Sequence, residues 1–496
     1  MDKHFLKFRK GIIGIDIDLL SPDRETRKLV YADWAASGRN YSPIETRIQE
    51  EIMPLVANTH TETSTSGMAM THTYHTAQGV IKDHVNADSE DLIITGCSGM
   101  TGLINKFQRI LGFRVNEELD QVLPEDECPV VFLTHMEHHS NHTSWLETIA
   151  TVEIIQPTAD GLVDLNSLKD LLQKYIDRPL KIASISACSN VTGISTPIHQ
   201  IAQMMHEAGG YCFVDFAYSA PYTKMNMHPE MEGADLDAIF FSPHKFLGGP
   251  GSTGVLIFNR DLYQREIPDN PGGGTVDWTN PWGGHKYIDD IEAREDGGTP
   301  AFLQTIKAAM CITLKNEMGI PNILAREHHL LELFWEKISG IPNLNILAPQ
   351  HRERFPVISF YINDLHYNLG VKLLNDKFGI QCRGGCSCAG TYGHYLLNID
   401  QSQSRQITDL IDQGDLTEKP GWIRVSLHPT MTDEEVEYIG QSIKELAENH
   451  HKWRDEYLFD PSCTDLEPRE FNPDLDLKEK LTRTITKNFL PRIPGG

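Results

Sequence analysis

The sequence of 496 residues predicts an α/β fold with a mostly parallel central sheet, helices on both faces of that sheet, and a smaller α+β domain. Two observations indicate this fold. Short apolar runs alternate with amphipathic segments of about ten residues or more, which is typical of strand–helix–strand crossovers. The composition, 40% hydrophobic and 23% charged, is that of a folded globular chain and excludes a disordered, collagen-like or coiled-coil protein.

The elements of the larger domain follow from periodicity and from end signals. Ser42 and Pro43 read as an N-cap followed by proline at the first helical position. Helical periodicity predicts helices at 44–56, 73–85, 99–111, 165–176 and 197–210. Apolar runs predict strands at 90–95, 129–134, 181–188, 211–216, 235–242 and 251–258.

The second half of the chain has a different character. The stretch Pro268–Pro281 is rich in glycine, proline and tryptophan, which is typical of a long functional loop or a domain boundary. From Ala301 helices dominate, and 355–362, 380–383 and 421–427 are expected as strands of a smaller sheet. The predicted division is an N-terminal segment 1–28 on the small domain, a large domain 29–298, a small C-terminal domain 299–455 and an acidic, loosely packed tail 456–496.

The charge balance excludes several classes of partner. Lysine and arginine total 44 against 69 aspartate and glutamate, so the formal net charge is −25. Such a surface repels phosphate backbones and anionic lipids, which argues against nucleic-acid binding and membrane attachment. No run approaches the ~18 apolar residues of a spanning helix. Nine cysteines are too few and too scattered for a disulfide framework, so a reducing compartment, the cytoplasm, is expected.

Polar and glycine-rich segments follow several of the predicted strands, where open parallel sheets bind ligands. Lys245 stands between an apolar strand and a glycine-rich turn, and a desolvated lysine there is easily deprotonated. Asp215 ends another strand, where a cofactor with a pyridinium nitrogen needs a carboxylate, although an ordinary turn cap has the same pattern. The glycines of 98–102 allow close backbone approach, and the following helix offers N–H groups to a phosphate.

Taken together, these segments carry a resemblance to a known family. The motifs SGMTG, EHHSNH, SNVTG, VDFA and SPHK occur in this order, each after a strand. The order resembles the class V aminotransferase fold type (fold type I) of pyridoxal-phosphate (PLP) enzymes, with the greatest likeness to cysteine desulfurases and selenocysteine lyases. The resemblance runs from the segment Val30–Ala36 to about Leu446. The resemblance implies that residues 29–298 form a PLP-binding domain.

The resemblance implies roles for individual residues. Lys245 matches the Schiff-base lysine, Asp215 the partner of the pyridine nitrogen, and His138 the histidine that stacks on the ring. The other implied cofactor ligands are Asn190 near the phenol oxygen, Met100, Thr101, Ser242 and His244 around the phosphate, and Thr299, which reaches the phosphate of the neighbouring subunit in a homodimer. Tyr218 stands where this branch of the family usually has glutamine, and it can still donate a hydrogen bond to the cofactor.

The substrate side of the site is implied by two arginines and by Asn190. Arg424 matches the arginine that grips the substrate carboxylate, for which a bidentate guanidinium is well shaped. Arg383 opens the segment that is similar to the family's catalytic-cysteine loop, at about 382–392. Aligned on Arg383, the catalytic thiol falls on Cys388, and Cys386 becomes a possible second thiol. The interval to Arg424 is longer than the family's, so a helical insertion is expected at about 391–420.

Two other readings of the cysteine and histidine clusters remain open at this point. Cys386 and Cys388 can simply pack, as buried cysteines often do. Two metal-binding sets are conceivable, although their spacing is unlike that of standard zinc sites. These sets are Cys382, Cys386, Cys388 and His394, and His135, His138, His139 and His142. No resident metal is expected.

The predicted function is a PLP-dependent cysteine desulfurase or selenocysteine lyase of the cytoplasm. Cys388 would take sulfur from a small amino-acid substrate as a persulfide and leave alanine, and a protein would then accept the sulfur. One alternative is a PLP-dependent lyase, epimerase or aminotransferase acting on another amino acid, with Cys388 non-catalytic. The other is a non-catalytic PLP-fold or metal-binding protein.

Overall fold

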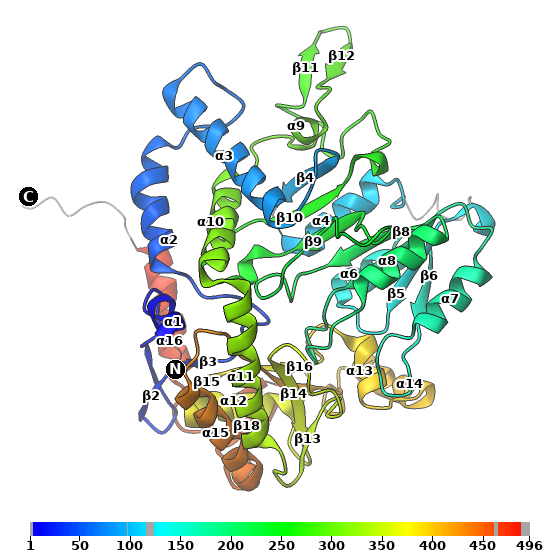
Figure 1. Cartoon of the computed structure of the whole chain (residues 1–496). Coiled ribbons are helices and arrows are strands. Elements are labelled where there is room, and N and C mark those ends of the chain that lie inside the picture. The colour runs from blue at the N-terminus through cyan, green and yellow to red at the C-terminus, as the bar shows by residue number, and fades with distance from the viewer. Residues whose placement is uncertain (1–2, 97, 116–123, 461–464, 488–496) are drawn as a thin grey trace, which may run out of the picture.

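The structure, a computed structural model, describes residues 3–96, 98–115, 124–460 and 465–487. A larger unit surrounds a central sheet, and a smaller unit lies below it in the view of Figure 1. Helices α10 (Phe302–Met318) and α11 (Ile320–Ile338) follow one another along the side that joins the two units (Figure 1).

The central sheet has seven strands, and its order explains where the polar strand ends meet. The strands lie in the order β4 (Asp91–Gly96), β10 (Gly254–Asn259), β9 (Ala238–Phe241), β8 (Tyr211–Asp215), β7 (Lys181–Ser186), β5 (Val130–Thr134) and β6 (Thr151–Ile155). Only β10 runs opposite to the others, pairing antiparallel with β4 and β9. The predicted mostly parallel sheet is therefore confirmed. The sequence missed β6, because this edge strand is only half-buried and lacks a continuous apolar run.

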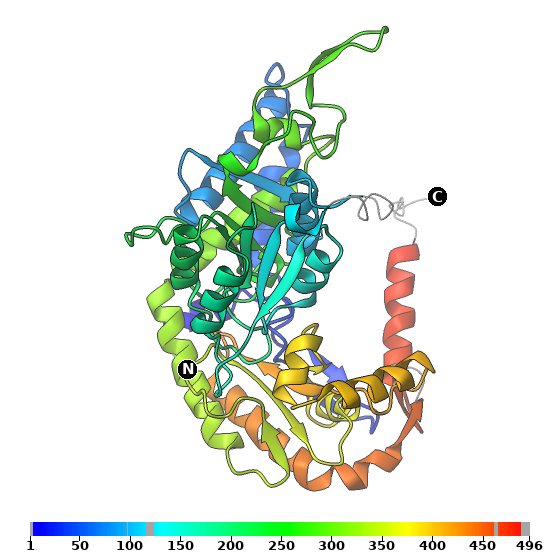
Figure 2. The same cartoon turned by 90° about the vertical axis from the view of Figure 1, so that its right-hand side faces the viewer.

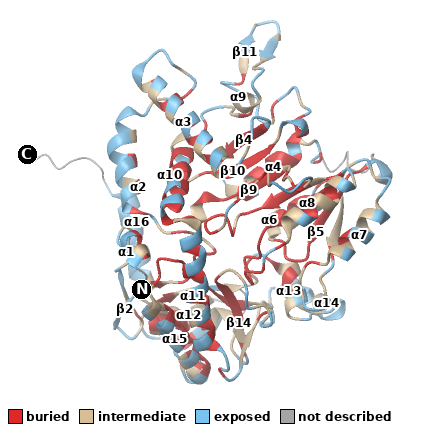
Figure 3. Ribbon diagram, in the orientation of Figure 1, coloured by how far each residue is buried: buried red, intermediate tan, exposed pale blue. Residues whose placement is uncertain are grey.

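Helices cover both faces of the sheet, as predicted. Alternate strand residues join different cores: Leu92 and Val131 pack with α4 and α6, whereas Ile93 and Phe132 pack with the helices of the other face. Figure 3 shows the resulting buried centre. The covering helices are α4 (Gly99–Ile110) and α6 (His139–Leu146) on one face, and α3 (Thr65–His84), α7 (Leu165–Lys174), α8 (Ile198–Glu207) and α10 on the other.

The stretch rich in glycine and proline forms a projecting hairpin. Strand β11 (Val276–Thr279) pairs with β12 (His285–Tyr287), followed by the short helix α9 (Ile291–Glu295). The hairpin stands out at the top of Figures 1 and 2. At its turn the side chain of Trp282 is 89% exposed.

The smaller unit is built on an antiparallel sheet, and the sequence predicted its central strands. The sheet order is β13 (Leu344–Ile346), β14 (Val357–Ile362), β17 (Trp422–Ser426) and β16 (Arg383–Gly385). Strand β15 (Ile380–Gln381) pairs with β3 (Val30–Tyr31) in parallel. The helices of this unit are α12 (Tyr367–Phe378), α13 (Gly390–Leu396), α14 (Gln401–Asp412) and α15 (Asp433–Trp453). The segment after the cysteine loop thus contains two helices, and its being an insertion remains a prediction.

Both ends of the chain contain local structure. The N-terminal segment forms α1 (Lys3–Arg9), β1 (Asp18–Leu20) and β2 (Thr26–Lys28). The predicted tail forms the hairpin β18 (Tyr457–Asp460) and β19 (Asp465–Pro468) and the helix α16 (Pro473–Thr486), in which no residue is buried. These elements contact α12 of the smaller unit: Tyr457 is 4% exposed and its hydroxyl donates to Asp376 Oδ2 at 2.8 Å, and Lys372 pairs with Asp474 at 2.8 Å. The sequence did not predict them, because these partners lie far away along the chain.

Short helical turns complete the description. Helix α2 (Ser42–Arg47) begins one residue earlier than predicted, because Tyr41 is the cap residue and Ser42 makes no capping hydrogen bond. After α2 the chain continues as a π-helix and then as a 3₁₀ turn that contains Pro54, because proline cannot donate the next α-helical hydrogen bond. The remaining turns are the π-helical Ile48–Ile52 and the 3₁₀ segments Met53–Leu55, Glu125–Glu127, Pro243–Lys245, Arg260–Leu262 and Arg454–Glu456.

The domain limits remain predictions. Within the predicted N-terminal segment, Arg9 forms an ion pair with Glu435 of α15 at 2.7 Å, so this segment contacts the smaller unit. The predicted boundary at 298/299 precedes α10, which packs against α3 of the larger unit.

A buried carboxylate joins the carboxyl ends of β5 and β7. Glu137 is 2% exposed. Its Oε1 accepts hydrogen bonds from Thr134 Oγ1 at 2.5 Å and from the Ser186 N–H at 2.9 Å. Its Oε2 accepts from Ser186 Oγ at 2.6 Å and from Asn141 Nδ2 at 2.7 Å. This network fixes the backbone just before His138, and burial raises the pKa of the Glu137 carboxyl while the hydrogen bonds oppose that rise.

Replacing Glu137 with alanine should lower the free energy of unfolding by about 3 kcal/mol, because the buried donors of Ser186 and Asn141 lose their acceptor. Chemical denaturation followed by tryptophan fluorescence measures the change. The control is Glu147→Ala at the exposed end of α6, which should leave stability nearly unchanged. Equal effects of the two substitutions would contradict the proposed importance of the network.

Candidate active site

A cavity of about 470 Å³ lies at the carboxyl ends of the central strands and is closed by residues of the smaller unit. It brings together nearly all of the residues that the sequence singled out. Those lining it are Met100, Thr101, His138, Asn190, Asp215, Tyr218, Ser242, His244, Lys245, Arg383, Cys388 and Arg424. Thr299 is exposed and does not line it, and Cys386 does not line it either.

Lys245 ends the short turn after β9. Burial lowers the pKa of its amine to about 8, although the negative charge of Asp215 works in the opposite direction. Arg424 and Arg383 add to the lowering. The amine therefore loses its proton far more easily than an exposed lysine does, and the neutral form is the nucleophile.

Asp215 is the last residue of β8. Its Oδ1 accepts the Ala217 N–H at 2.7 Å, which is the one hydrogen bond that the carboxylate makes with the described residues. Burial raises the pKa of the carboxyl to about 6. A buried carboxylate with one free oxygen is complementary to a cationic N–H group.

His138 is the cap residue of α6, and its protonation state can be inferred from its contacts. The Ser140 N–H donates to Nδ1 at 3.1 Å, so Nδ1 carries the lone pair and the proton lies on Nε2. Burial and the neighbouring Lys245 lower the pKa of His138 to about 3. The ring is therefore neutral near pH 7.

An anion cradle is formed where α4 begins. Ser98 and Gly99 have positive φ angles of 72° and 60°, and the Met100 N–H donates to Ser242 Oγ at 2.9 Å. A Cβ on Gly99 would lie 2.9 Å from Ser242 Oγ, so glycine is required for this approach. Thr101 Oγ1 lies 2.6 Å from Ser140 Oγ. Backbone N–H groups at the start of a 12-residue helix, together with hydroxyls, suit a phosphate.

Asp33 links the two arginines and was missed in the sequence. Its Oδ1 lies 2.9 Å from a terminal nitrogen of Arg424, and its Oδ2 lies 3.2 Å from Nε of Arg383. Arg424 is 2% exposed and also donates to the Asn190 carbonyl at 3.3 Å, while its own Nε has no partner among the described residues. The sequence offered no more than the Tyr-Ala-Asp-Trp segment that contains Asp33. In the structure Asp33 follows β3 and forms an isolated bridge with Ser426, the last residue of β17.

The cysteine loop is held from three sides. Ser387 and Cys388 both have positive φ angles, 51° and 57°. Asn190 Nδ2 donates to the Ser387 carbonyl at 2.9 Å, Trp422 Nε1 donates to Ser387 Oγ at 3.1 Å, and the His139 N–H donates to the Cys388 carbonyl at 2.7 Å. The thiol-bearing residue Cys388 is exposed, whereas Cys386 is half-buried. These contacts place Cys388 at the cavity wall, and the side-chain amide of Asn190 is directed towards the loop.

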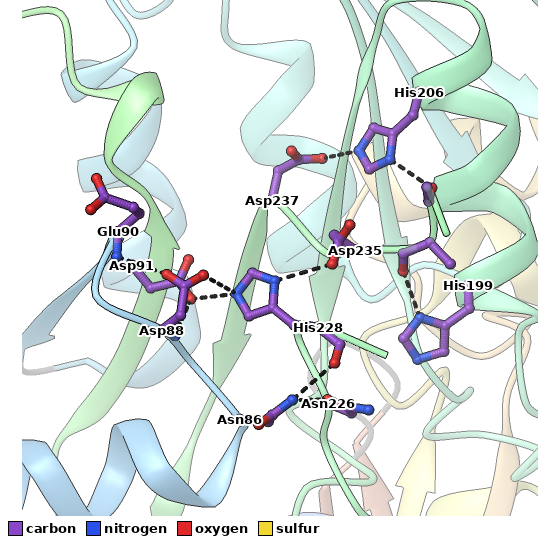
Figure 4. A network of polar contacts seen from close by, with 12 residues as sticks. Asn86, Asp88, Glu90, Asp91, His199, His206, Asn226, His228, Asp235 and Asp237 are labelled. Carbon is purple, nitrogen blue, oxygen red and sulfur yellow. Dashed lines mark hydrogen bonds and ion pairs between the residues drawn. The ribbon is translucent and has the colours of Figure 1, made fainter. Parts of the chain in front are cut away.

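Among the described residues, neither of the two conceivable metal-binding sets converges. His135 Nε2 contacts the Gly161 carbonyl, His142 contacts Thr391, and His394 contacts Gly390 and Ser404. Within the described part of the chain, the group that could converge on a metal is Asp88, Asp91 and His228, at the start of β4, and none of the three lines the cavity. Figure 4 shows it as a hydrogen-bonded network, with His228 Nε2 2.7 Å from Asp91 Oδ2.

Like Asp33, which does not line the cavity itself, several of its lining residues escaped sequence reasoning. They are small or hydroxylic residues, and no local pattern distinguishes them from ordinary core and loop positions. They are Ala35, Ala36, Ser140, Ser186, Cys188, Ser252, Thr253 and Ser387. Among the described residues, no helix is long and apolar enough to cross a membrane.

Comparison with known proteins places this geometry in a family. Residues 30–439 match the family described as aminotransferase class-V. A probable cysteine desulfurase of Staphylococcus aureus (strain N315) is 28% identical over 379 residues, covering 75% of this chain and 86% of the relative. One of Streptomyces coelicolor is 28% identical over 368 residues, covering 73% and 84%.

Solved structures agree on the fold. The apo cysteine desulfurase of Thermococcus onnurineus NA1 superposes with a TM-score of 0.68 at 22% identity, covering 85% of this chain and 95% of that one. The cysteine desulfurase CsdA of Escherichia coli gives 0.68 at 20% identity, covering 90% and 98%. The predicted family and fold type are confirmed, and the chain belongs to the class V aminotransferase family.

Proposed function

We propose that this chain is a PLP-dependent cysteine desulfurase, which takes sulfur (or selenium) from cysteine or selenocysteine, carries it on Cys388 and releases alanine. Class V aminotransferases and cysteine desulfurases are PLP-dependent families, and the relatives named above support this reaction class. The single observation that carries the proposal is the exposed Cys388 on the wall of the cavity that also holds Lys245, Asp215 and Arg424.

The residues of the cavity fit PLP. The free carboxylate oxygen of Asp215 is complementary to a protonated ring nitrogen, and the start of α4 with Ser242 is complementary to a phosphate. The easily deprotonated amine of Lys245 suits attachment to an aldehyde. The further residues that would hold the cofactor are His138 at its ring, Asn190 and Tyr218 at its phenol oxygen, Met100, Thr101 and His244 at its phosphate, and Thr299 from a second copy of the chain.

Bound in this cavity, PLP would supply an electron sink for negative charge at the substrate Cα. Residues of the chain itself would bind the substrate and move its proton. Arg424 and Arg383 bind the substrate carboxylate, for which the Asp33 carboxylate already shows the fitting geometry. Lys245 moves the Cα proton.

The sulfur transfer itself falls to Cys388. Its thiolate attacks the substrate sulfur, the bond from that sulfur to the substrate Cβ breaks, and an S–S bond forms on Cys388. The carbon skeleton takes up a proton and leaves as alanine. An exposed thiol on a loop with two left-handed residues is well placed to enter the cavity and then to meet an acceptor.

The partners of this proposal follow from the same site. A homodimer in which Thr299 completes the phosphate site of the neighbouring subunit is proposed, because Thr299 is exposed and outside its own cavity. A protein that accepts the persulfide sulfur is proposed, with Cys386 as a possible second thiol beside Cys388. The cytoplasm is the proposed location, in keeping with the free thiols of Cys188, Cys212, Cys311, Cys382, Cys386 and Cys388.

The alternatives differ in what Cys388 does. A lyase, epimerase or aminotransferase would use Lys245, Asp215 and Arg424 without the thiol, and a non-catalytic protein would turn over no amino acid. Incubation of the purified protein with a panel of amino acids, with assays for alanine, sulfide and pyruvate, separates these functions. Alanine and protein-bound sulfur from cysteine or selenocysteine are expected, and their absence alongside another product would refute the desulfurase.

Replacing Cys388 with alanine should reduce alanine formation from cysteine by about two orders of magnitude or more, because the nucleophile that receives sulfur is removed. The Cys386→Ala variant is the matched control and should keep most of the activity. Steady-state alanine assays at saturating cysteine measure both. Full activity of the Cys388 variant would favour the rival chemistry.

The rate at which the apoprotein binds added PLP covalently should increase with pH and become constant above about pH 8. Only neutral Lys245 is a nucleophile, and its pKa is about 8. Below that value the rate should fall about tenfold per pH unit. Rapid-mixing absorbance measures it.

A variant tests the cause of this pH profile. In Asp215→Asn the midpoint should move to lower pH, since the charge of Asp215 raises the pKa of Lys245. Asp289→Asn on the projecting hairpin is the control and should leave the midpoint in place. A midpoint near pH 10 in the parent would show that burial does not lower the pKa of Lys245. A midpoint that rises in the Asp215 variant would show that the charge of Asp215 does not raise this pKa.

A further inference from the structure

Helix α13, which directly follows the cysteine loop, is attached to the larger unit by a series of side chains. It lies where the smaller unit meets the larger one (Figure 1). Three of its side chains contact residues of the larger unit, and the pairs are Thr391 with His142 at 3.1 Å, Tyr392 with Thr192 at 3.1 Å, and Tyr395 with Gln156 at 3.3 Å. The helix therefore belongs to the smaller unit by its place in the chain but is held by the larger one.

His139 makes the contacts closest to the thiol-bearing residue. Its backbone N–H donates to the Cys388 carbonyl at 2.7 Å, and its ring Nε2 accepts the Gly390 N–H at 2.9 Å. A Cβ at position 390 would lie only 3.1 Å from Nε2, so glycine allows this close approach. His139 thus fixes the backbone directly after Cys388, whereas other side chains hold the residue before it.

The ring contact also supplies a cap that α13 lacks. The helix begins at Gly390, and its cap residue, Ala389, makes no side-chain capping hydrogen bond. The first N–H groups of a helix have no partner within the helix, so an acceptor from elsewhere stabilises its start. His139 Nε2 provides this acceptor, and the start of α13 is therefore tied to the start of α6.

This contact requires a neutral imidazole. Because Nε2 accepts a hydrogen bond, the single ring proton lies on Nδ1, and a second proton on Nε2 would face the Gly390 N–H. Burial, followed by the charge of Lys419, lowers the pKa of His139, so the ring is neutral near pH 7. The contact is present above this pKa and is lost as the pH falls through it. Burial also lowers the pKa of the two neighbouring histidines, and the other titratable groups on the elements around the ring are His138 and His142 on α6 and Cys388 on the loop.

The neighbours of His139 explain why this contact matters for the cavity. His138 precedes it and lines the cavity, and Cys388 lines the same cavity from the smaller unit. The start of α6 therefore relates the side chain at the proposed cofactor ring to the thiol. A displacement of about 1 Å between reacting groups can lower a rate about a hundredfold.

We propose that His139 is a positioning residue of the sulfur transfer, which holds the start of α13 so that Cys388 stays at the wall of the catalytic cavity. This inference rests on the proposed desulfurase function. His139 is not among the residues that line the cavity, and it acts through the backbone of Cys388 and Gly390. The helical segment after the cysteine loop thereby gains a role, because α13 is the part through which the larger unit holds the thiol.

Hydrogen exchange in the full-length protein, supplied with PLP, tests whether the loop is held. His139→Leu keeps a side chain of similar size and removes the acceptor, so the amides of 386–391 should exchange about tenfold faster than in the parent. His139→Gln places an acceptor oxygen at the same position along the side chain and should restore slow exchange. His328→Leu, at an exposed position of α11, is the matched control and should exchange as the parent does.

Steady-state kinetics of alanine formation tests the effect on the reaction. His139→Leu should lower kcat about tenfold and change the KM for cysteine by less than about twofold, because the residues proposed to bind the substrate are unaltered while the thiol is displaced. His139→Gln should recover most of the loss, and His328→Leu should match the parent. Circular dichroism confirms that the variants are folded, so that a lower kcat is not mistaken for unfolding.

The exchange experiment over a range of pH tests the need for a neutral ring. After correction for the intrinsic pH dependence of exchange, the protection of 386–391 in the parent should be lost as the pH falls through the pKa of His139, which lies below the ordinary value of about 6.5. His139→Gln has no ring to protonate and should keep its protection over this range.

Three outcomes would overturn the proposal. Exchange in His139→Leu at the rate of the parent would show that the ring does not hold the loop. Faster exchange with an unchanged kcat would show that the contact does not position the thiol, and a His139→Gln variant that behaves as His139→Leu would exclude the acceptor as the cause. A parent that forms no alanine from cysteine would instead refute the proposed desulfurase, and with it the role in sulfur transfer, whatever the exchange rates are.

Discussion

The buried carboxylate of Glu137 is the interaction on which the arrangement of the catalytic cavity depends. It ties the ends of β5 and β7 to the start of α6. The next two residues then act in the cavity: His138 lines it, and His139 holds the cysteine loop through the Cys388 carbonyl and the Gly390 N–H. One buried side chain thereby relates the central sheet to a loop of the smaller unit, more than two hundred residues away along the chain.

Burial also sets the chemistry of the cavity. The same loss of water lowers the pKa of Lys245 and raises that of Asp215, so both groups change protonation closer to neutral pH than exposed residues of their types. Asp33 plays a different part, because it neutralises two arginines at the point where the smaller unit closes the cavity. Removal of water and the contacts of Asp33 thus set the charge state of Lys245, Asp215 and the two arginines at this cavity.

Glu327 shows the opposite situation, a buried acid whose oxygens accept no hydrogen bond from the described residues and on which Lys315 acts only through its charge. Its α11 neighbours Leu331 and Trp335 line a second cavity, and Phe355, which also lines it, packs against Tyr218 of the catalytic cavity. The two cavities are thus built from one continuous stretch of packing at the joint between the units.

The sequence by itself determined the alternation of strands and helices, the mostly parallel sheet and the family. It also singled out Asp215, Lys245 and Cys388 as candidate site residues. Periodicity and short motifs are local properties of a chain, so they can be read without the structure. It could not determine β6, the ordered tail, Asp33 or the free carboxyl of Glu327. An edge strand, a counter-ion and an unpaired buried group are defined by what lies opposite them in space. Only tertiary packing decides such partners, since hydrogen bonds and burial depend on residues that are distant in sequence.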